Sequence, residues 1–182
     1  MESAGLTREK MLSALRALSD ALGEQDVLGE VCIFGGGAML LAFGARIRTK
    51  DVDALFQPAQ IIRELARRIA EEQGLSANWL NDAVKGFLSE RHEVTTGNLP
   101  QFPHLRMTMP VPEYLLAMKC MAARLVPDNG RSDLEDIVFL IRHLKLRNAP
   151  EVLNIVEQYY PGSRIPVKTQ YLIEGLFEEG KL

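Results

Sequence analysis

Long apolar runs are missing from this sequence, and their absence excludes two classes of protein. No stretch approaches the roughly 18–20 uncharged apolar residues that a bilayer-spanning helix needs, so the sequence predicts no membrane span. The first segment carries Arg8, Lys10 and Arg16 among its apolar residues and lacks the uninterrupted apolar stretch of a signal peptide. We therefore expect a cytoplasmic protein.

Cysteine and histidine are too few and too scattered for a disulfide framework or a structural zinc site. Only Cys32 and Cys120 occur, each within an apolar run, which predicts two buried thiols. The three histidines, His92, His104 and His143, form no paired ligand motif. Neither a disulfide scaffold nor a zinc domain is expected.

An excess of positive charge is also missing. Lysine and arginine number 21 against 24 aspartate and glutamate residues, for a net charge of −3, so any nucleic acid must be bound by a local cluster of cations. The 182 residues are 47% hydrophobic and 25% charged, a composition typical of a globular protein, which excludes global disorder. This length suits one large domain, or one domain with a helical appendage.

Apolar spacing and turn residues divide the chain into a mixed front part and a helical back part. Strands are predicted over residues 31–34, 51–56 and 105–109. Helices are predicted from Thr7 to Gly23 and over 38–43, 59–72, 77–88, 113–125, 133–144, 150–160 and 168–179. We expect an α+β (α/β) fold, with a small mixed sheet flanked by helices and a helical C-terminal layer.

Two parts of the chain follow from this pattern. Residues 1–126 are predicted to form the α/β core, and residues 127–182 a helical part packed as one unit with that core. The stretch 127–132 contains a proline and a glycine and is the best candidate for a seam. The alternative interpretation of the same stretch is a turn between two helices of one domain.

The segment from Gly35 to Asp53 carries the chemistry. Three consecutive glycines between a strand and a helix let the backbone approach a bulky ligand and present free amides to an anion, which predicts a phosphate-binding turn. Asp51 and Asp53 stand two residues apart in a predicted strand, so their side chains project to one face. Two close carboxylates raise each other's pKa unless a cation neutralises them, and such oxygen ligands suit Mg²⁺ bridging substrate phosphates.

Each feature also has a purely structural interpretation. A triple glycine is often only a turn, and an Asp-x-Asp pair on a surface strand is often only solvated. The cations between them, Arg46, Arg48 and Lys50, could be a solvated connection. Together the features occur in the order that a phosphoryl-transfer site requires, with cations for the phosphate chain just ahead of the carboxylates. The segment is neither a Walker loop nor a Rossmann fingerprint, because no Gly-Lys-Ser/Thr and no Gly-x-Gly-x-x-Gly occurs.

The stretch Gly35-Gly36-Gly37-Ala38 followed by Arg46-x-Arg48-Thr49-Lys50-Asp51-Val52-Asp53 resembles the signature of the nucleotidyltransferase fold, the polymerase-β-like superfamily. More closely, it is similar to small bacterial and archaeal nucleotidyltransferase-like proteins related to the AbiE-type toxins of toxin–antitoxin pairs. Three further segments fit that group: residues 79–84, 112–124 and 133–137. The resemblance covers roughly residues 30–145, and its portion from Gly35 to Asp53 is the most specific.

The resemblance implies a role for each matching residue. Nucleotide triphosphate would be held by Gly35, Gly36 and Gly37, with Arg48 and Thr49 near the phosphates, and Mg²⁺ by Asp51 and Asp53. The AbiE-type toxins also use a helical lysine and a later aspartate, and the positions that look equivalent are Lys119, Asp133 and Asp136. Lys119 lies among apolar helix residues, where its charge would be costly to bury without a partner. A structural ion pair between Lys119 and Asp136 is the equally weighted alternative.

The sequence departs from the superfamily in one respect. Active members usually carry a third carboxylate on a later strand, and the predicted strand over residues 105–109 has none. Glu93 could substitute if residues 91–95 form a strand, and Asp82 could if its predicted helix faces the cleft. The assignment of a general base is therefore open.

Three functions are consistent with these residues. The first is Mg²⁺-dependent transfer of a nucleoside monophosphate from a nucleoside triphosphate to a hydroxyl acceptor. RNA, particularly the tRNA acceptor end, is the candidate acceptor, and the protein would be a toxin with a cognate antitoxin as partner. The second is a catalytically inactive nucleotide- or protein-binding module of the same fold, which the missing carboxylate favours. The third is a helical regulator or antitoxin.

Overall fold

The computed structural model describes residues 5–123, 133–180 and 182, and this part of the chain has a mixed α+β architecture. It divides into two compact units. Unit 1 comprises Met1–Gly86 and Val94–Met109, and unit 2 comprises Phe87–Glu93 and Pro110–Leu182. The expected boundary between residues 126 and 127, and the seam at 127–132, lie outside the described residues and stay predictions.

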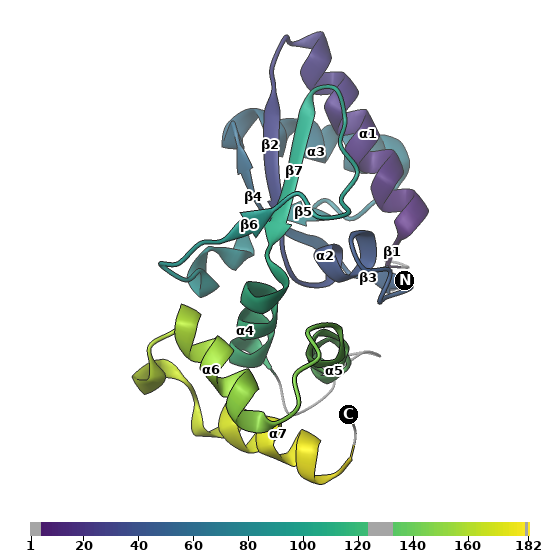
Figure 1. Cartoon of the computed structure of the whole chain (residues 1–182). Coiled ribbons are helices and arrows are strands. Elements are labelled where there is room, and N and C mark those ends of the chain that lie inside the picture. The colour runs from purple at the N-terminus through teal and green to yellow at the C-terminus, as the bar shows by residue number, and fades with distance from the viewer. Residues whose placement is uncertain (1–4, 124–132, 181) are drawn as a thin grey trace. The chain divides into compact units, whose positions relative to one another are not determined.

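Unit 1 contains a mixed five-stranded sheet in the order β5-β4-β2-β7-β6 (Figure 1). The strands are β2 (Gly29–Ile33), β4 (Val52–Gln57), β5 (Leu80–Asn81), β6 (Val94–Thr95) and β7 (Leu105–Pro110). Strand β2 pairs with β4 antiparallel and with β7 parallel, and β5 adds to β4 parallel. A second, two-stranded sheet joins β1 (Leu6–Thr7) to β3 (Arg48–Thr49). The three predicted strands are present, whereas the two-residue strands were not predicted.

Helices α1 (Arg8–Glu24) and α3 (Ala59–Gln73) pack against each other on one face of the sheet (Figure 1). That face carries the alternate, buried positions of β4, which are Val52, Ala54 and Phe56. Two helix ends are as predicted: the Thr7 side chain caps α1 by accepting from the Lys10 amide, and Gly74 ends α3 in the left-handed conformation. Helix α1 runs past Gly23, its predicted stop, to Glu24. The other face of β4 carries Asp53, Leu55 and Gln57.

The predicted helix over residues 77–88 is wrong. In its place the chain forms β5 and then a short 3₁₀-helix, η1 (Ala83–Phe87). Trp79 decides this outcome: its side chain is fully buried and its indole Nε1 donates to the Ala66 carbonyl at 2.9 Å, while its own carbonyl accepts from the Val52 amide at 2.6 Å. Tertiary pairing with β4 thus overrides local helix propensity here.

Unit 2 is helical, and its α-helices coincide with segments for which helices were predicted. Its helices are α4 (Pro112–Ala122), α5 (Asp133–His143), α6 (Ala149–Tyr159) and α7 (Val167–Glu178), with a 3₁₀-turn η2 (Gly162–Arg164). Helix α4 packs against α5 and α6, and α6 against α7. Tyrosine hydroxyls tie the segment 87–93 to these helices, since Tyr114 accepts from the Ser89 amide and Tyr160 donates to the Phe87 carbonyl. None of the described helices has the length and apolarity needed to cross a bilayer.

Candidate functional site

The glycine turn lies where β2 ends and α2 (Gly35–Leu41) begins, and its three glycines have two different roles. Gly35 has φ +53°, a conformation that other residues rarely adopt, and a Cβ there would lie 3.6 Å from Asp53 Oδ2. A Cβ on Gly36 would lie only 2.5 Å from Thr49 Oγ1, and a Cβ on Gly37 2.9 Å from Ile33 Cγ2. Gly36 and Gly37 therefore let α2 pack closely on its neighbours, while Gly35 brings the bend beside a carboxylate.

The two aspartates meet at the start of β4, although Asp51 lies just before the strand and only Asp53 lies within it. The backbone of Asp53 faces β2, since its carbonyl accepts from the Phe34 amide at 2.8 Å. The backbone before Asp51 is fixed by Thr49, whose buried hydroxyl donates to the Asp51 carbonyl at 3.1 Å. Both carboxylates are half-buried, and Asp53 lies beside the glycine bend. The structure thus brings together the glycine turn, Thr49 and the aspartate pair.

Burial and then the charge of Asp53 raise the pKa of Asp51, against a smaller opposing effect of Lys50. A raised carboxyl pKa means that ionising Asp51 costs folding stability at neutral pH, and that this cost disappears as the pH falls through the raised value. Oxygen donors under mutual repulsion fit a hard divalent cation such as Mg²⁺. Among the described residues, no group of three or more His, Cys, Asp or Glu side chains that could hold a metal ion is found.

We predict that Asp51→Asn stabilises the metal-free protein, because the substitution removes the repulsion without changing the size of the side chain. The expected rise in Tm is about 1–2 °C at pH 7, typical of a partly solvated repulsion of about 0.5 kcal/mol in a protein of this size. Differential scanning fluorimetry across pH checks it. The difference from the wild type must shrink as the pH is lowered, and a lower Tm for Asp51→Asn at pH 7 would contradict the prediction.

Three cationic residues lie on the connection between α2 and β4, just ahead of this pair in the chain. Arg46 is half-buried, and its Nη1 atom lies 3.2 Å from the position that a Cβ on Gly36 would occupy. Arg48 and Lys50 are exposed, as is Ile47 between the arginines. Exposed cationic side chains such as Arg48 and Lys50 can bind a phosphate chain without a large desolvation cost.

The N-terminal segment supports the site, a feature that the sequence did not reveal. Strand β1 holds Arg48 and Thr49 by pairing with β3, in the register Leu6 with Thr49. Arg8 then reaches the end of α2, where its Nη1 atom donates to the Leu41 carbonyl at 2.7 Å and the Leu40 carbonyl at 3.4 Å. Arg8 thereby satisfies carbonyl groups that the end of a short helix leaves unpaired.

Arg8→Leu is expected to lower the free energy of unfolding by about 1–2 kcal/mol, because two carbonyls lose a charged donor. Urea denaturation measures the change. Arg16→Leu, which alters an exposed arginine of the same helix, serves as the control and should change the value by less than about 0.5 kcal/mol. Equal effects of the two substitutions would show that Arg8 does not support α2.

The second group of candidates, Lys119, Asp133 and Asp136, belongs to unit 2 and forms a cluster there. Lys119 Nζ lies 2.7 Å from Asp136 Oδ2 and 3.2 Å from Asp133 Oδ1. Lys119 is 8% exposed and Asp136 2% exposed, so both charges are buried and their pairing offsets the cost of desolvation. This geometry fits the structural ion pair that was one of the two interpretations of Lys119.

Both candidates for a third carboxylate are engaged by other side chains within their own units. Asp82 is paired with Lys85 and Arg63, and above all the hydrogen bond from Lys85 lowers its pKa. Glu93 accepts from the Tyr159 hydroxyl at 2.7 Å, and hydrogen bonds from Tyr159 and then Arg91 lower its pKa. A carboxylate whose pKa is lowered is a weaker base.

Two other polar residues lie on the face of the sheet that carries Asp53, one beside it and the other two strands away. Asn81 of β5 lies directly across from Asp53, on the same face of the sheet, and its Oδ1 atom accepts from the Ala83 amide. Thr108 of β7 is level with Cys32, one pair along from Asp53 on that face. Asn81 was part of a segment singled out in the sequence, but no motif indicated its place beside Asp53.

Comparisons with protein-family models, curated proteins and solved structures found no match for this chain.

Proposed function

We propose that this chain is a Mg²⁺-dependent nucleotidyltransferase, with unit 1 as a nucleotidyltransferase fold that moves a nucleoside monophosphate from a nucleoside triphosphate to a hydroxyl acceptor. One observation carries the proposal: the half-buried Asp51 and Asp53 stand together at the start of β4, with the Asp53 carboxylate next to the positive-φ bend at Gly35. A bend without side chains leaves room for a triphosphate to approach this carboxylate pair.

In this proposal the residues of the site have separate roles in binding the metal ion, the triphosphate and the acceptor. Asp51 and Asp53 would hold Mg²⁺, which supplies charge neutralisation for the triphosphate and its pyrophosphate leaving group. Thr49 orients Asp51 through its hydrogen bond to the Asp51 carbonyl. Arg46, Arg48 and Lys50 would bind the phosphate oxygens, and this local cluster would also attract an RNA acceptor to a protein of net charge −3. A toxin role, with an antitoxin as partner, is part of the same proposal.

A purified sample incubated with Mg²⁺, total RNA and each of four α-³²P-labelled nucleoside triphosphates tests the activity. We expect label to be transferred to RNA from one of the four nucleoside triphosphates, with release of pyrophosphate. Addition of EDTA should abolish this transfer. Separation of the labelled RNA by size then shows whether tRNA is the acceptor. The absence of both transfer and Mg²⁺-dependent nucleotide binding would contradict the proposal.

A catalytically inactive binding module is the second candidate, favoured by the composition of β7. The residues of β7 on the face that carries Asp53 are Arg106, Thr108 and Pro110, and none of them supplies a carboxylate as base or metal ligand. A protein of this kind would bind a labelled nucleoside triphosphate in the presence of Mg²⁺ and return it unchanged. The same incubation therefore distinguishes the two candidates.

A further inference from the structure

Strand β4 has an open edge beyond the point where β5 ends. The parallel register of β5 covers only Val52 and Asp53, while the antiparallel partner β2 continues along β4 to Gln57. Strand β5 ends at Asn81, whose side-chain Oδ1 accepts a hydrogen bond from the Ala83 amide. This turn leads the chain into η1. In the described part of the chain, no strand pairs with the edge from Ala54 to Gln57 on the side opposite β2.

The alternation of the ladder shows which backbone groups face this edge. The backbone N–H and C=O of Asp53 point toward β2, because the Asp53 carbonyl accepts from the Phe34 amide. Those of Val52 point toward β5, because the Val52 amide donates to the Trp79 carbonyl. By alternation, the backbone groups of Leu55 and Gln57 point toward β2, whereas the N–H and C=O of Phe56 point toward the open edge. Pro58 closes the edge, since it has no N–H and its carbonyl accepts from Ile62 at 3.1 Å.

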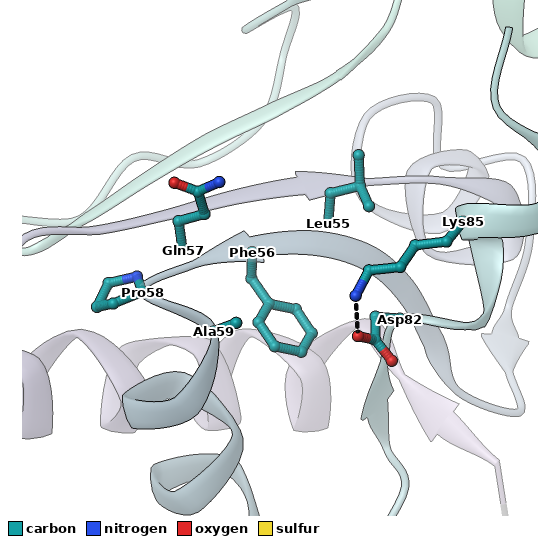
Figure 2. Close-up of a pocket in the computed structure, with 7 residues that line it drawn as sticks. All are labelled: Leu55, Phe56, Gln57, Pro58, Ala59, Asp82 and Lys85. Carbon is teal, nitrogen blue, oxygen red and sulfur yellow. Dashed lines mark hydrogen bonds and ion pairs between the residues drawn. The ribbon is translucent and has the colours of Figure 1, made fainter.

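A pocket of about 330 Å³ lies at this edge, and its lining residues are Leu55, Phe56, Gln57, Pro58, Ala59, Asp82 and Lys85 (Figure 2). Figure 2 shows Leu55 and Gln57 on one side of β4 and the Phe56 ring on the other, with the Asp82–Lys85 pair beside them. The size is at the lower end for ligand pockets and suits one apolar side chain with its flanking backbone.

The charge around the pocket is positive. Asp82 Oδ2 is shared by Lys85 Nζ at 2.5 Å and Arg63 Nη2 at 3.1 Å, so two cations face one carboxylate. Arg63 also lies over the Phe56 ring, with its Cζ 5.8 Å from the ring centroid. Both cationic side chains are well exposed, 61% for Lys85 and 45% for Arg63, and remain accessible to a further anion.

We propose that this edge binds an extended, acidic peptide segment of a partner protein by strand addition. One residue of the peptide exchanges backbone hydrogen bonds with the N–H and C=O of Phe56. An adjacent apolar side chain enters the pocket beside Leu55, and a neighbouring carboxylate binds Lys85 and Arg63. Main-chain bonds supply affinity in this mode, and the pocket and the cations supply specificity. The proposal is independent of nucleotide transfer.

A fluorescein-labelled seven-residue peptide of alternating valine and glutamate is the probe. Fluorescence anisotropy should show saturable binding to the full chain. Binding should weaken at least tenfold when the central peptide amide is N-methylated. A separate peptide in which lysine replaces glutamate should also bind at least tenfold more weakly. Lys85→Glu should weaken binding to a similar degree. Arg16→Glu, which makes the same change in net charge at an exposed position of α1, should leave binding within twofold.

Amide exchange measured by NMR locates the bound peptide. In the free protein the Phe56 amide should exchange faster than the amides of Leu55 and Gln57. Addition of the peptide should slow the exchange of the Phe56 amide at least tenfold. The proposal is overturned if the Phe56 amide is already protected in the free protein, or if N-methylation leaves binding unchanged. Protection of the Phe56 amide by an RNA oligonucleotide in place of the peptide also overturns the proposal, because the occupant is then nucleic acid. Protection that rises with protein concentration overturns it as well, because the occupant is then a second copy of this chain.

Discussion

Replacing Lys119 with methionine is expected to lower the free energy of unfolding by about 3–5 kcal/mol, a large part of the stability of a domain. The reason is the environment that the lysine leaves behind. Asp136 is 2% exposed and would keep a buried negative charge after losing the ammonium group that lies 2.7 Å away. Methionine fills a similar volume, so the loss reports the charge and not a cavity.

The double variant Lys119→Met with Asp136→Leu is the matched control. Replacing both members of a buried ion pair with apolar residues often restores stability, so we expect most of the loss to be recovered. Urea denaturation of the two single variants and the double variant gives the coupling energy. A loss below about 1 kcal/mol for Lys119→Met, combined with loss of nucleotide transfer, would reverse the assignment and make Lys119 a catalytic residue.

Asp53→Asn is expected to lower the rate of nucleotide transfer by about 10³-fold or more, since the amide keeps the shape of the side chain but loses the charge that holds a metal. Asp51→Asn should have a similar effect. The loss should be in kcat, and thermal stability should be unchanged or higher because the repulsion between the two carboxylates is gone.

Steady-state transfer assays with Asp20→Asn as control measure this effect, since Asp20 is an exposed carboxylate of α1 in the same unit. The control should retain at least a third of the wild-type rate. Activity that survives in both Asp51→Asn and Asp53→Asn would remove the aspartate pair from the mechanism.

Local sequence patterns predicted the elements that local interactions determine. The apolar spacing of α1 and α3, the Thr7 cap and the Gly74 end are read directly from the chain and are confirmed. The alternation of β4 is confirmed as well, with Val52, Ala54 and Phe56 buried on one face. These features depend on residues close together in sequence, which is why a single sequence was sufficient.

What the sequence did not reveal depends on distant contacts. Residues 79–81 have no strand pattern of their own and become β5 because Trp79 is buried and paired with Val52. Arg8 has no motif, and its role at the end of α2 comes from a contact 33 residues away. The Lys119–Asp136 pair was one of two equally weighted interpretations, and only the distances and the burial favour the structural one.

Paramagnetic broadening by Mn²⁺ is the most direct test of the central claim that Asp51 and Asp53 bind a divalent cation beside the glycine bend. NMR spectra of the wild type titrated with Mn²⁺ should lose the amide signals of Gly35, Gly36, Asp51 and Asp53 first, and Mg²⁺ should restore them. The Asp51→Asn, Asp53→Asn variant should show no such loss. Broadening centred on another part of the chain, or unchanged in that variant, would contradict the account.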